Sequence, residues 1–244
     1  MAQPRLARLV RAERLGPEAR LLTFLLAEGE IGFSGGQYII VNTGIELAAG
    51  KLAKRAYSIL SSDADQREFQ IAVRRIGEGP GSNFMHRIEV GAELTFSGPW
   101  GKFVTNGASA GPRLVFATDT GITAALGLLQ GLGSRARADD TTAVWFVESD
   151  DYFLPPSFVQ SLLSRRCQNF GVVANREVGD ATRVASALAM LERSLESILP
   201  STAFLAGDGA VIYPLRDRLI AAGMQRESIR VEAFFNNPER KAQS

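Results

Sequence analysis

The stretch RLVFATDTGITAALGLL, Arg113–Leu129, decides the fold class of the second half of the chain. Its apolar run Leu114–Ala117 is typical of a strand that is buried on both faces. After the turn at Gly121, the segment Ile122–Leu132 has the length and composition of a helix. A strand, a tight turn and a helix in this order are the opening unit of an alternating α/β domain.

The same alternation continues towards the C-terminus. Four more short, β-rich runs follow, with the sequences AVWFVES, FGVVANR, TAFLAGD and IRVEAFF. Helix-length segments lie between them, at Pro156–Ser164, Arg183–Ile198 and Val211–Ala222. We therefore predict a five-stranded parallel sheet covered by helices on both faces, which binds ligands at the carboxyl ends of its strands.

Upstream of this unit the pattern changes. The stretch TNGASAGP, Thr105–Pro112, is rich in small residues and is typical of a linker. Before it, apolar residues mostly alternate in six short runs, RLARLVRAERL, ARLLTFLLA, GQYIIVNT, KRAYSILS, EFQIAVRRI and AELTFSGPW. Six such runs separated by turn residues indicate a small antiparallel barrel or sandwich. We place the domain boundary so that residues 1–108 form the β domain and residues 109–244 the α/β domain.

The composition excludes several classes of protein. With 45% hydrophobic and 22% charged residues the chain is expected to fold, and its formal net charge of +1 gives no electrostatic case for a nucleic-acid or membrane-surface partner. Cys167 is the only cysteine, so no internal disulfide or cysteine-ligated cluster can form. We expect a cytoplasmic protein without a metal site, and no apolar run approaches the ~18 residues of a membrane span.

A cation, a flat phenol and a hydroxyl lie close together in the fourth of the alternating runs. Arg55 and Tyr57 point to the same face of a strand, where they can hold a phosphate and a planar ring side by side. Ser58 faces the other way and can offer its hydroxyl or its amide to a ring edge. An exposed strand with an outward arginine and tyrosine explains the same tetrapeptide.

A glycine-rich turn follows the next predicted strand, in VRRIGEGPGSNFMHRI at residues 73–88. We expect a helix that starts near Ser82, with Gly79 and Gly81 before it and the Ser82 hydroxyl as its N-cap. Exposed amides and the helix dipole at such a start favour an anionic phosphate. A plain turn before a capped helix is the alternative.

Together these motifs resemble the ferredoxin–NADP reductase family, in which an Arg-x-Tyr-Ser motif on a barrel strand and a later Gly-x-x-Ser loop hold FAD. Five further segments occur in the order of that family, GQY at 36–38, GPWG at 98–101, ATDTGIT at 117–123, AGDG at 206–209 and VEAFF at 231–235. The resemblance implies an antiparallel β-barrel FAD-binding domain followed by a Rossmann-like parallel α/β nucleotide-binding domain. It also implies hydride transfer between NAD(P)H and FAD, and single-electron exchange with a separate carrier protein, ferredoxin or flavodoxin.

The resemblance assigns roles around FAD. Arg55 would pair with the FAD phosphate, Tyr57 would pack on the isoalloxazine ring, and Ser58 would lie near the flavin atom that accepts hydride. Glu232 matches an acidic residue near the flavin and could relay a proton, although an ordinary strand-end charge explains it equally. Phe235 or its neighbour Phe234 would cover a flavin face, unless both belong to the core. The remaining FAD contacts would be Ala56, Ala72, Val73, Arg74, Gly79, Gly81 and Ser82.

The resemblance also assigns the nicotinamide coenzyme to the second domain. Thr118, Thr120 and Gly121 would place small side chains and amides against its pyrophosphate. The turn departs from the family pattern, because Asp119 stands where a glycine is expected and Ala124 where a proline is expected. A carboxylate that faces the pyrophosphate would repel it, unless Asp119 points away.

Other positions bear on the choice of coenzyme. Arg176 and Arg183 match arginines that meet the 2′-phosphate of NADP, which favours NADP(H), although two solvated surface charges explain them equally. Gly207 and Asp208 would lie close to the nicotinamide, in a segment where many relatives have a cysteine. Three acids stand where some relatives carry another cation and favour NADH instead, Glu148, Asp150 and Asp151.

Two further functions remain compatible with the sequence. The same scaffold could reduce free flavin, a quinone or an oxygenase component. Alternatively, the departures at Asp119 and Ala124 could mark an FAD-bearing electron-transfer or regulatory subunit with impaired nicotinamide binding. His86, the only histidine, is expected to have a packing or capping role.

Overall fold

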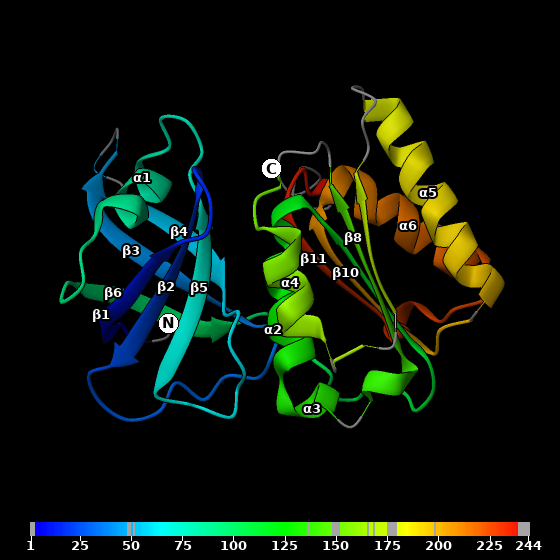
Figure 1. Cartoon of the computed structure of the whole chain (residues 1–244), viewed down its shortest axis with the longest axis horizontal. Helices are drawn as coiled ribbons and strands as arrows, with labels where there is room; N and C mark the ends of the chain where they lie inside the picture. Colours follow the sequence, from blue (N-terminus) through cyan, green and yellow to red (C-terminus); the bar gives the residue numbers. More distant parts are fainter. Residues whose placement is uncertain are drawn as a thin grey trace.

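The computed structural model describes residues 3–47, 50, 52–135, 137–147, 152–164, 166–167, 169–174, 180–197 and 199–238. Two sheets lie side by side (Figure 1), and each contains the strands of one half of the chain. The first sheet is antiparallel and the second is parallel. This confirms the predicted fold class, a barrel-like antiparallel unit followed by a parallel α/β unit.

Each of the six alternating runs forms a strand of the first sheet. The strands are β1 (Arg5–Arg14), β2 (Ala19–Leu26), β3 (Tyr38–Glu46), β4 (Leu52–Ser58), β5 (Glu68–Arg74) and β6 (Glu93–Trp100), and helix α1 (Pro80–Arg87) joins the last two. Alternate side chains point inward and pack around Phe24, Phe69 and Phe96, whose neighbouring ring centroids are 5.5 Å apart.

The first sheet curls until its two end strands approach each other. Its strand order is β4-β3-β6-β1-β2-β5. Just after β4, the Leu60 amide donates a hydrogen bond of 2.8 Å to the Gln70 carbonyl on β5. Because β4 and β5 run in opposite directions, this closure places the segment that follows β4 beside the middle of β5.

The second sheet has the strand order β11-β10-β7-β8-β9. Its strands are β7 (Arg113–Thr118), β8 (Thr141–Val147), β9 (Asn169–Ala174), β10 (Thr202–Asp208) and β11 (Ile229–Phe235). The order reverses between β7 and β10, which makes that point of the carboxyl edge the expected ligand crevice.

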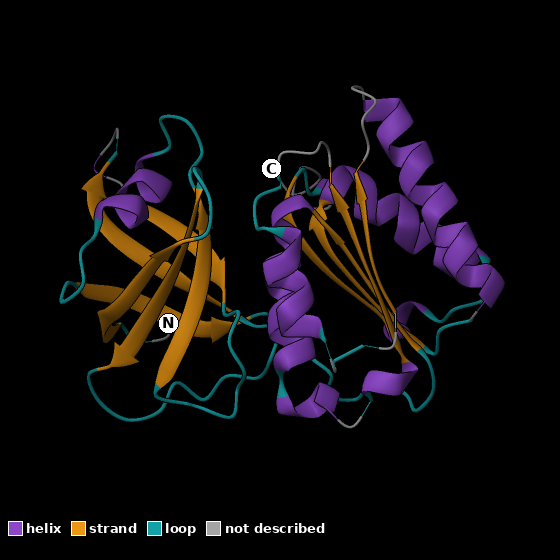
Figure 2. Cartoon of the chain, viewed as in Figure 1, coloured by secondary structure: helices purple, strands orange, loops and turns teal. Residues whose placement is uncertain are grey.

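Helices cover both faces of this sheet (Figure 2). On the face towards the first sheet lie α2 (Ile122–Gln130), α3 (Leu132–Arg135) and α4 (Pro156–Leu163), and on the other face α5 (Asp180–Ser197) and α6 (Gly209–Ala221) (Figure 1). Among the described residues, no helix is both long enough and apolar enough to cross a membrane.

One hydrophobic cluster runs through both halves of the molecule. Leu60 and Phe103 from the first half pack with Leu128 and Phe204 of the α/β half. The Phe103 and Phe204 rings meet edge to face, with centroids 5.6 Å apart. The two sheets therefore share an apolar seam, whose packing helps to set their relative position.

Candidate functional site

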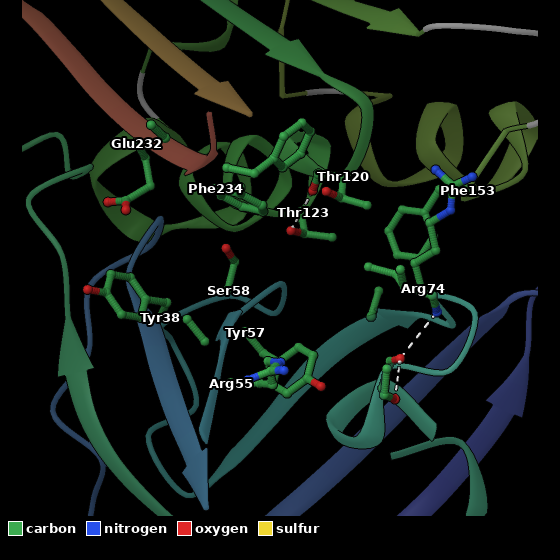
Figure 3. Close-up of a pocket in the computed structure, with 17 residues that line it drawn as sticks. Tyr38, Arg55, Tyr57, Ser58, Arg74, Thr120, Thr123, Phe153, Glu232 and Phe234 are labelled. Carbon is green, nitrogen blue, oxygen red and sulfur yellow. Dashed lines mark hydrogen bonds between the residues drawn. The ribbon is translucent and has the colours of Figure 1, made fainter. Parts of the chain in front are cut away.

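A cavity of about 510 Å³ opens at the seam (Figure 3). Its volume falls in the roughly 300–1,000 Å³ that is usual for cofactor sites. The first half contributes Tyr38, Arg55, Ala56, Tyr57, Ser58, Ala72, Arg74, Ile76, Gly79 and Ser82, and the second half contributes Thr120, Thr123, Phe153, Glu232, Ala233, Phe234 and Phe235.

The end of β4 forms the floor of this cavity, where Arg55 and Tyr57 lie side by side (Figure 3). Arg55 is exposed and donates from Nη1 to the Lys54 carbonyl at 2.8 Å. Burial raises the pKa of Tyr57 to about 12, against the opposing influence of the Arg55 charge. The Tyr57 phenol is therefore neutral at physiological pH and presents a flat, uncharged surface.

The hydroxyl of Ser58 points into the cavity (Figure 3). This side chain is only 7% exposed, and it faces Thr123 and Phe234 across the open space (Figure 3). A buried hydroxyl at this position can offer one hydrogen bond to a planar ligand that fills the cavity.

The glycine-rich turn corrects one expectation. Helix α1 begins at Pro80, and its N-cap is Gly79, which makes no side-chain capping bond. The Ser82 hydroxyl instead donates to the Gly79 carbonyl at 3.1 Å and accepts from the Ile76 amide at 3.2 Å. Ser82 therefore lies inside the first turn of α1, and its hydroxyl bonds back to the glycine-rich loop. It does not cap the free backbone amides at the start of the helix.

The start of α1 passes close to Arg55. A Cβ at Gly81 would lie 2.5 Å from Arg55 Cγ, so a larger residue there would displace the arginine. Because Gly81 has no side chain, the side chain of Arg55 can lie against the first turn of α1. A cation beside a helix N-terminus suits a diphosphate, and these residues fit the charged end of FAD.

The opposite wall comes from the end of β11. Tyr38 and the Glu232 carboxylate lie on the same side of the cavity (Figure 3). Gly101 leaves room for both, because a Cβ there would lie 3.1 Å from the Tyr38 ring and 3.4 Å from Glu232 Oε2. Phe234 and Phe235 are 37% and 43% exposed and line the cavity, so the alternative that they belong to the core is wrong.

Two predicted FAD contacts lie outside the lining of this cavity, Gly81 and Val73. Val73 points into the barrel core, and its carbonyl is bonded to His86 Nε2 at 3.0 Å. Burial lowers the pKa of His86, in spite of this hydrogen bond. His86 thus holds the end of β5 against α1, in agreement with the packing role expected for it.

At the point where the strand order reverses, small residues bring β7 and β10 together. Thr118 is fully buried, and its hydroxyl accepts a 2.7 Å hydrogen bond from the Asp208 amide. A Cβ at Gly207 would lie 2.3 Å from Thr118 Oγ1, and one at Gly121 would lie 2.4 Å from the Ala206 carbonyl. The expectation that the Thr118 side chain faces a ligand is corrected, because that side chain joins the two strands.

Arg183 is neither a solvated surface charge nor a cation free to meet a phosphate. It is 6% exposed and lies between two carboxylates, donating from Nη1 to Asp208 Oδ2 at 2.5 Å and from Nη2 to Asp119 Oδ2. Asp119 therefore turns its charge towards Arg183. The other residues expected to bear on coenzyme choice, Arg176, Glu148, Asp150 and Asp151, lie outside the described residues.

Several lining residues were missed by the sequence prediction. Tyr38 belongs to the quoted GQY segment, which was a signal for it. Ile76 and Thr123 lie in the quoted stretches 73–88 and 117–123, which were signals for them, whereas Phe153 belongs to no motif and reaches the cavity only through the packing of the two halves.

Comparisons with known proteins agree with this architecture. Residues 6–105 match the family described as "Oxidoreductase FAD-binding domain". A "Ferredoxin--NADP reductase B" from Sorangium cellulosum (strain So ce56) is 38% identical over 147 residues, which cover 60% of this chain and 58% of the relative. The reductase component of naphthalene dioxygenase/salicylate hydroxylase systems from Ralstonia sp is 27% identical over 89% of this chain and 65% of the relative. The chain thus spans less than two thirds of either relative.

Solved structures share the complete fold. The crystal structure of a ferredoxin NADP⁺ reductase from Neisseria gonorrhoeae with bound FAD and NADP superposes with a TM-score of 0.78 at 20% identity, covering 96% of this chain and all of that one. The match therefore includes both halves and the seam between them. Residues 6–105 therefore belong to the oxidoreductase FAD-binding domain family, and the chain as a whole is similar in sequence and fold to ferredoxin–NADP reductases.

Proposed function

We propose that the protein is an FAD-dependent oxidoreductase that exchanges electrons between NAD(P)H and a separate carrier protein. The observation that carries the proposal is a single cavity with a phosphate-compatible end at Arg55 and α1 and a ring-compatible end at Tyr57, with a wall formed by the α/β half. When bound, FAD supplies the ability to accept two electrons from a nicotinamide and to release them singly.

At the charged end, the chain's own groups would hold a diphosphate. Arg55 offers a planar set of donors, and the amides at the start of α1 point along the helix axis. The close approach at Gly81 keeps both within the same small region. We propose a domain boundary near residue 108, so that all these phosphate contacts belong to the first domain.

At the ring end, the side chains would orient a flat cofactor and exclude water. The neutral phenol of Tyr57 and the ring of Phe234 lie on different sides of the cavity (Figure 3). Ser58 would donate or accept a hydrogen bond at the ring edge. Glu232, on the Tyr38 side, is the acidic residue that would hold or deliver a proton.

The α/β half would place the coenzyme against this ring. Thr120, in the turn after β7, and Thr123, in the first turn of α2, line the cavity beside the point where the strand order reverses. We propose NADP(H) as the coenzyme, supported by the name of the Sorangium relative and by the NADP bound in the Neisseria structure.

For the carrier we propose a ferredoxin or a flavodoxin, since the Sorangium and Neisseria relatives are named as ferredoxin reductases. An oxygenase component is the second candidate acceptor, because the Ralstonia relative is the reductase component of such systems. Steady-state rates with ferredoxin, flavodoxin and an oxygenase component at equal enzyme concentration distinguish these acceptors.

Flavin content and anaerobic reduction test the proposal. Purified or FAD-reconstituted protein is expected to be yellow and to bleach with NADPH faster than with NADH in stopped-flow mixing. Arg55→Ala should weaken FAD binding at least tenfold. Arg67→Ala, which removes an exposed arginine outside the cavity lining, is the matched control. A protein that takes up no FAD, or FAD that neither coenzyme reduces, would contradict the proposed function.

A further inference from the structure

An unusual ion-pair cluster lies where the strand order of the parallel sheet reverses. Asp119 follows β7, Asp208 ends β10, and Arg183 reaches both carboxylates from the first turns of α5. Asp119 has a φ of +48°, a left-handed conformation that glycine adopts readily and most other residues avoid. A carboxylate thus occupies a backbone position suited to glycine, beside the cavity-lining Thr120.

The two carboxylates differ in how much they depend on Arg183. Asp208 also accepts hydrogen bonds from the Ala210 amide at 2.9 Å and from Asn236 Nδ2 at 3.0 Å. Its side chain is 4% exposed, against 12% for Asp119. Asp208 is therefore the inner partner that fixes Arg183, and Asp119 covers the outer side of the guanidinium.

Arg183 retains binding capacity in this arrangement. Its Nε is buried and has no hydrogen-bond partner among the described residues. A guanidinium offers five donors, and a phosphate can accept two of them side by side. Arg183 is also a nearly buried cation at the crevice where an α/β domain receives phosphate-bearing ligands.

We propose that Asp119 is an internal competitor for the anion site on Arg183, so that a phosphate group of the nucleotide reaches this arginine only by displacing the Asp119 carboxylate. The inference rests on the proposed function, because it requires that a phosphate-bearing coenzyme binds at this edge. Asp119 then acts as a specificity-determining residue through Arg183. Its charge lowers the affinity for every ligand whose phosphate uses that cation.

A purely structural role for Asp119 leads to a different expectation. If the carboxylate only shapes the loop, its loss affects ligands with and without phosphate alike. If it competes with phosphate, its loss strengthens the binding of phosphate-bearing ligands alone. A comparison of ligands that carry phosphate with a ligand that does not therefore distinguishes a structural role of Asp119 from a competing one.

The test is equilibrium binding to the oxidised, FAD-loaded protein, measured by calorimetry with NADP⁺, NAD⁺, ADP-ribose and adenosine. Asp119→Asn removes the charge and keeps a residue that tolerates positive φ. We expect it to tighten the binding of NADP⁺ about tenfold, within the usual range of coupling between sites, and to leave adenosine unchanged; NAD⁺ and ADP-ribose should gain equally if the competing group is the pyrophosphate. Asp119→Gly, which suits the backbone equally, should give the same result.

Asp139→Asn is the matched control. Asp139 is exposed and lies just before β8, at the edge of the sheet formed by the amino ends of the strands. Its substitution by asparagine removes one negative charge, as Asp119→Asn does. It should alter none of the four affinities. In an Arg183→Gln background that still melts cooperatively, Asp119→Asn should no longer strengthen binding, because the cation for which the two anions compete is gone.

The two coenzymes identify which phosphate is involved. A larger gain for NADP⁺ than for NAD⁺ assigns the competition to the 2′-phosphate, and equal gains assign it to the pyrophosphate; both support the inference. Unchanged affinities in Asp119→Asn, or an equal gain for adenosine, overturn it while the proposed function stands. Absence of any nucleotide binding in wild type and variants alike contradicts the proposed function, and the inference with it.

Discussion

Tyr57 shows how the cavity changes the chemistry of a single side chain. Burial raises its pKa to about 12, from an ordinary value near 10. The folded protein therefore resists ionising this phenol, and the unfolded chain does not. This difference in pKa contributes stability that is fully present below about pH 10 and is lost as the pH rises towards 12.

This contribution predicts a pH-dependent difference between wild type and Tyr57→Phe. Between pH 9 and pH 11 the unfolding free energy of the flavin-free wild type should fall by about 1 kcal/mol more than that of the variant. Urea unfolding at the two pH values measures the difference, and the other tyrosines cancel in the comparison. Equal losses in both proteins would show that Tyr57 is solvated like a free phenol.

A substitution at Gly81 should affect cofactor binding without disturbing the fold. In Gly81→Ala the new Cβ would lie 2.5 Å from Arg55 Cγ, so we expect the flexible arginine to move and the fold to remain. The dissociation constant of FAD, measured by flavin fluorescence, should rise about tenfold. Gly16→Ala is the control, because its Cβ would meet nothing within 4 Å. An unchanged FAD affinity in Gly81→Ala would mean that the position of Arg55 does not matter for binding.

How far the site residues could be predicted depends on where their partners lie in the chain. Arg55, Tyr57 and Ser58 were predicted to gather at one site because they are close neighbours on one strand. Arg183 was assigned to a phosphate, and its carboxylate partners lie 25 and 64 residues away. No local pattern indicates such a pair, so its ion-pair cluster could be seen only in the folded chain.

Helix α2 packs so closely on the first half that one of its positions requires glycine. A Cβ at Gly127 would lie 2.1 Å from the Ile59 carbonyl, which belongs to the backbone and cannot rotate away. Glycine costs a helix interior about 1 kcal/mol relative to alanine, so the sequence accepts a weaker helix for a closer contact.

We therefore expect Gly127→Ala to destabilise the protein by about 1–3 kcal/mol in spite of its better helix propensity. Gly133→Ala in α3 is the matched helical control, because there the obstacle is the Thr105 side chain, 2.2 Å away, which can change its rotamer. Chemical unfolding should show a clearly smaller loss for the control. A stabilised Gly127→Ala would contradict the close packing at this contact.

Elements were predictable where periodicity alone decides them. The six alternating runs and the five apolar runs all form strands, because each pattern buries one or two faces. Helix starts were less accurate: α1 begins at Pro80 rather than near Ser82, and α5 at Asp180 rather than at Arg183. The helix expected over Ile122–Leu132 ends at Gln130, because Gly131 has an extended backbone. The amide of the next residue, Leu132, bonds to Asp63 in the other half instead of continuing the helix.

In the whole molecule, the two halves behave as one packed body around the cavity. The shared hydrophobic cluster is joined by polar contacts, such as the 2.6 Å hydrogen bond from Gln130 Nε2 to the Leu60 carbonyl. The sequence predicts two units and a ligand site, but it contains no local signal for this seam. Complementary surfaces arise only when both units are folded, so the lining contributed by Phe153 could not be predicted.

Asp63 makes the seam testable, because its carboxylate bonds to both halves. Oδ2 accepts from the Gly35 amide at 2.9 Å in the first half, and Oδ1 accepts from the Leu132 amide at 2.7 Å in the second. Asp65 is a natural control, since its carboxylate accepts from the amides of Arg67 and Glu68, both within the first half. The two aspartates thus make the same number of backbone bonds, and only the Asp63 pair spans the seam.

We expect Asp63→Ala and Asp65→Ala to lower the unfolding free energy by similar amounts, about 1–2 kcal/mol, because each leaves two amides without their carboxylate. Only Asp63→Ala should also weaken the coupling between the halves. In calorimetry its transition should broaden or split, and hydrogen exchange at the Leu132 amide should become faster, whereas Asp65→Ala keeps one sharp transition. If both variants unfold in one equally sharp transition, the hydrophobic cluster alone is sufficient to couple the halves, and the polar contacts of Asp63 serve only local stability.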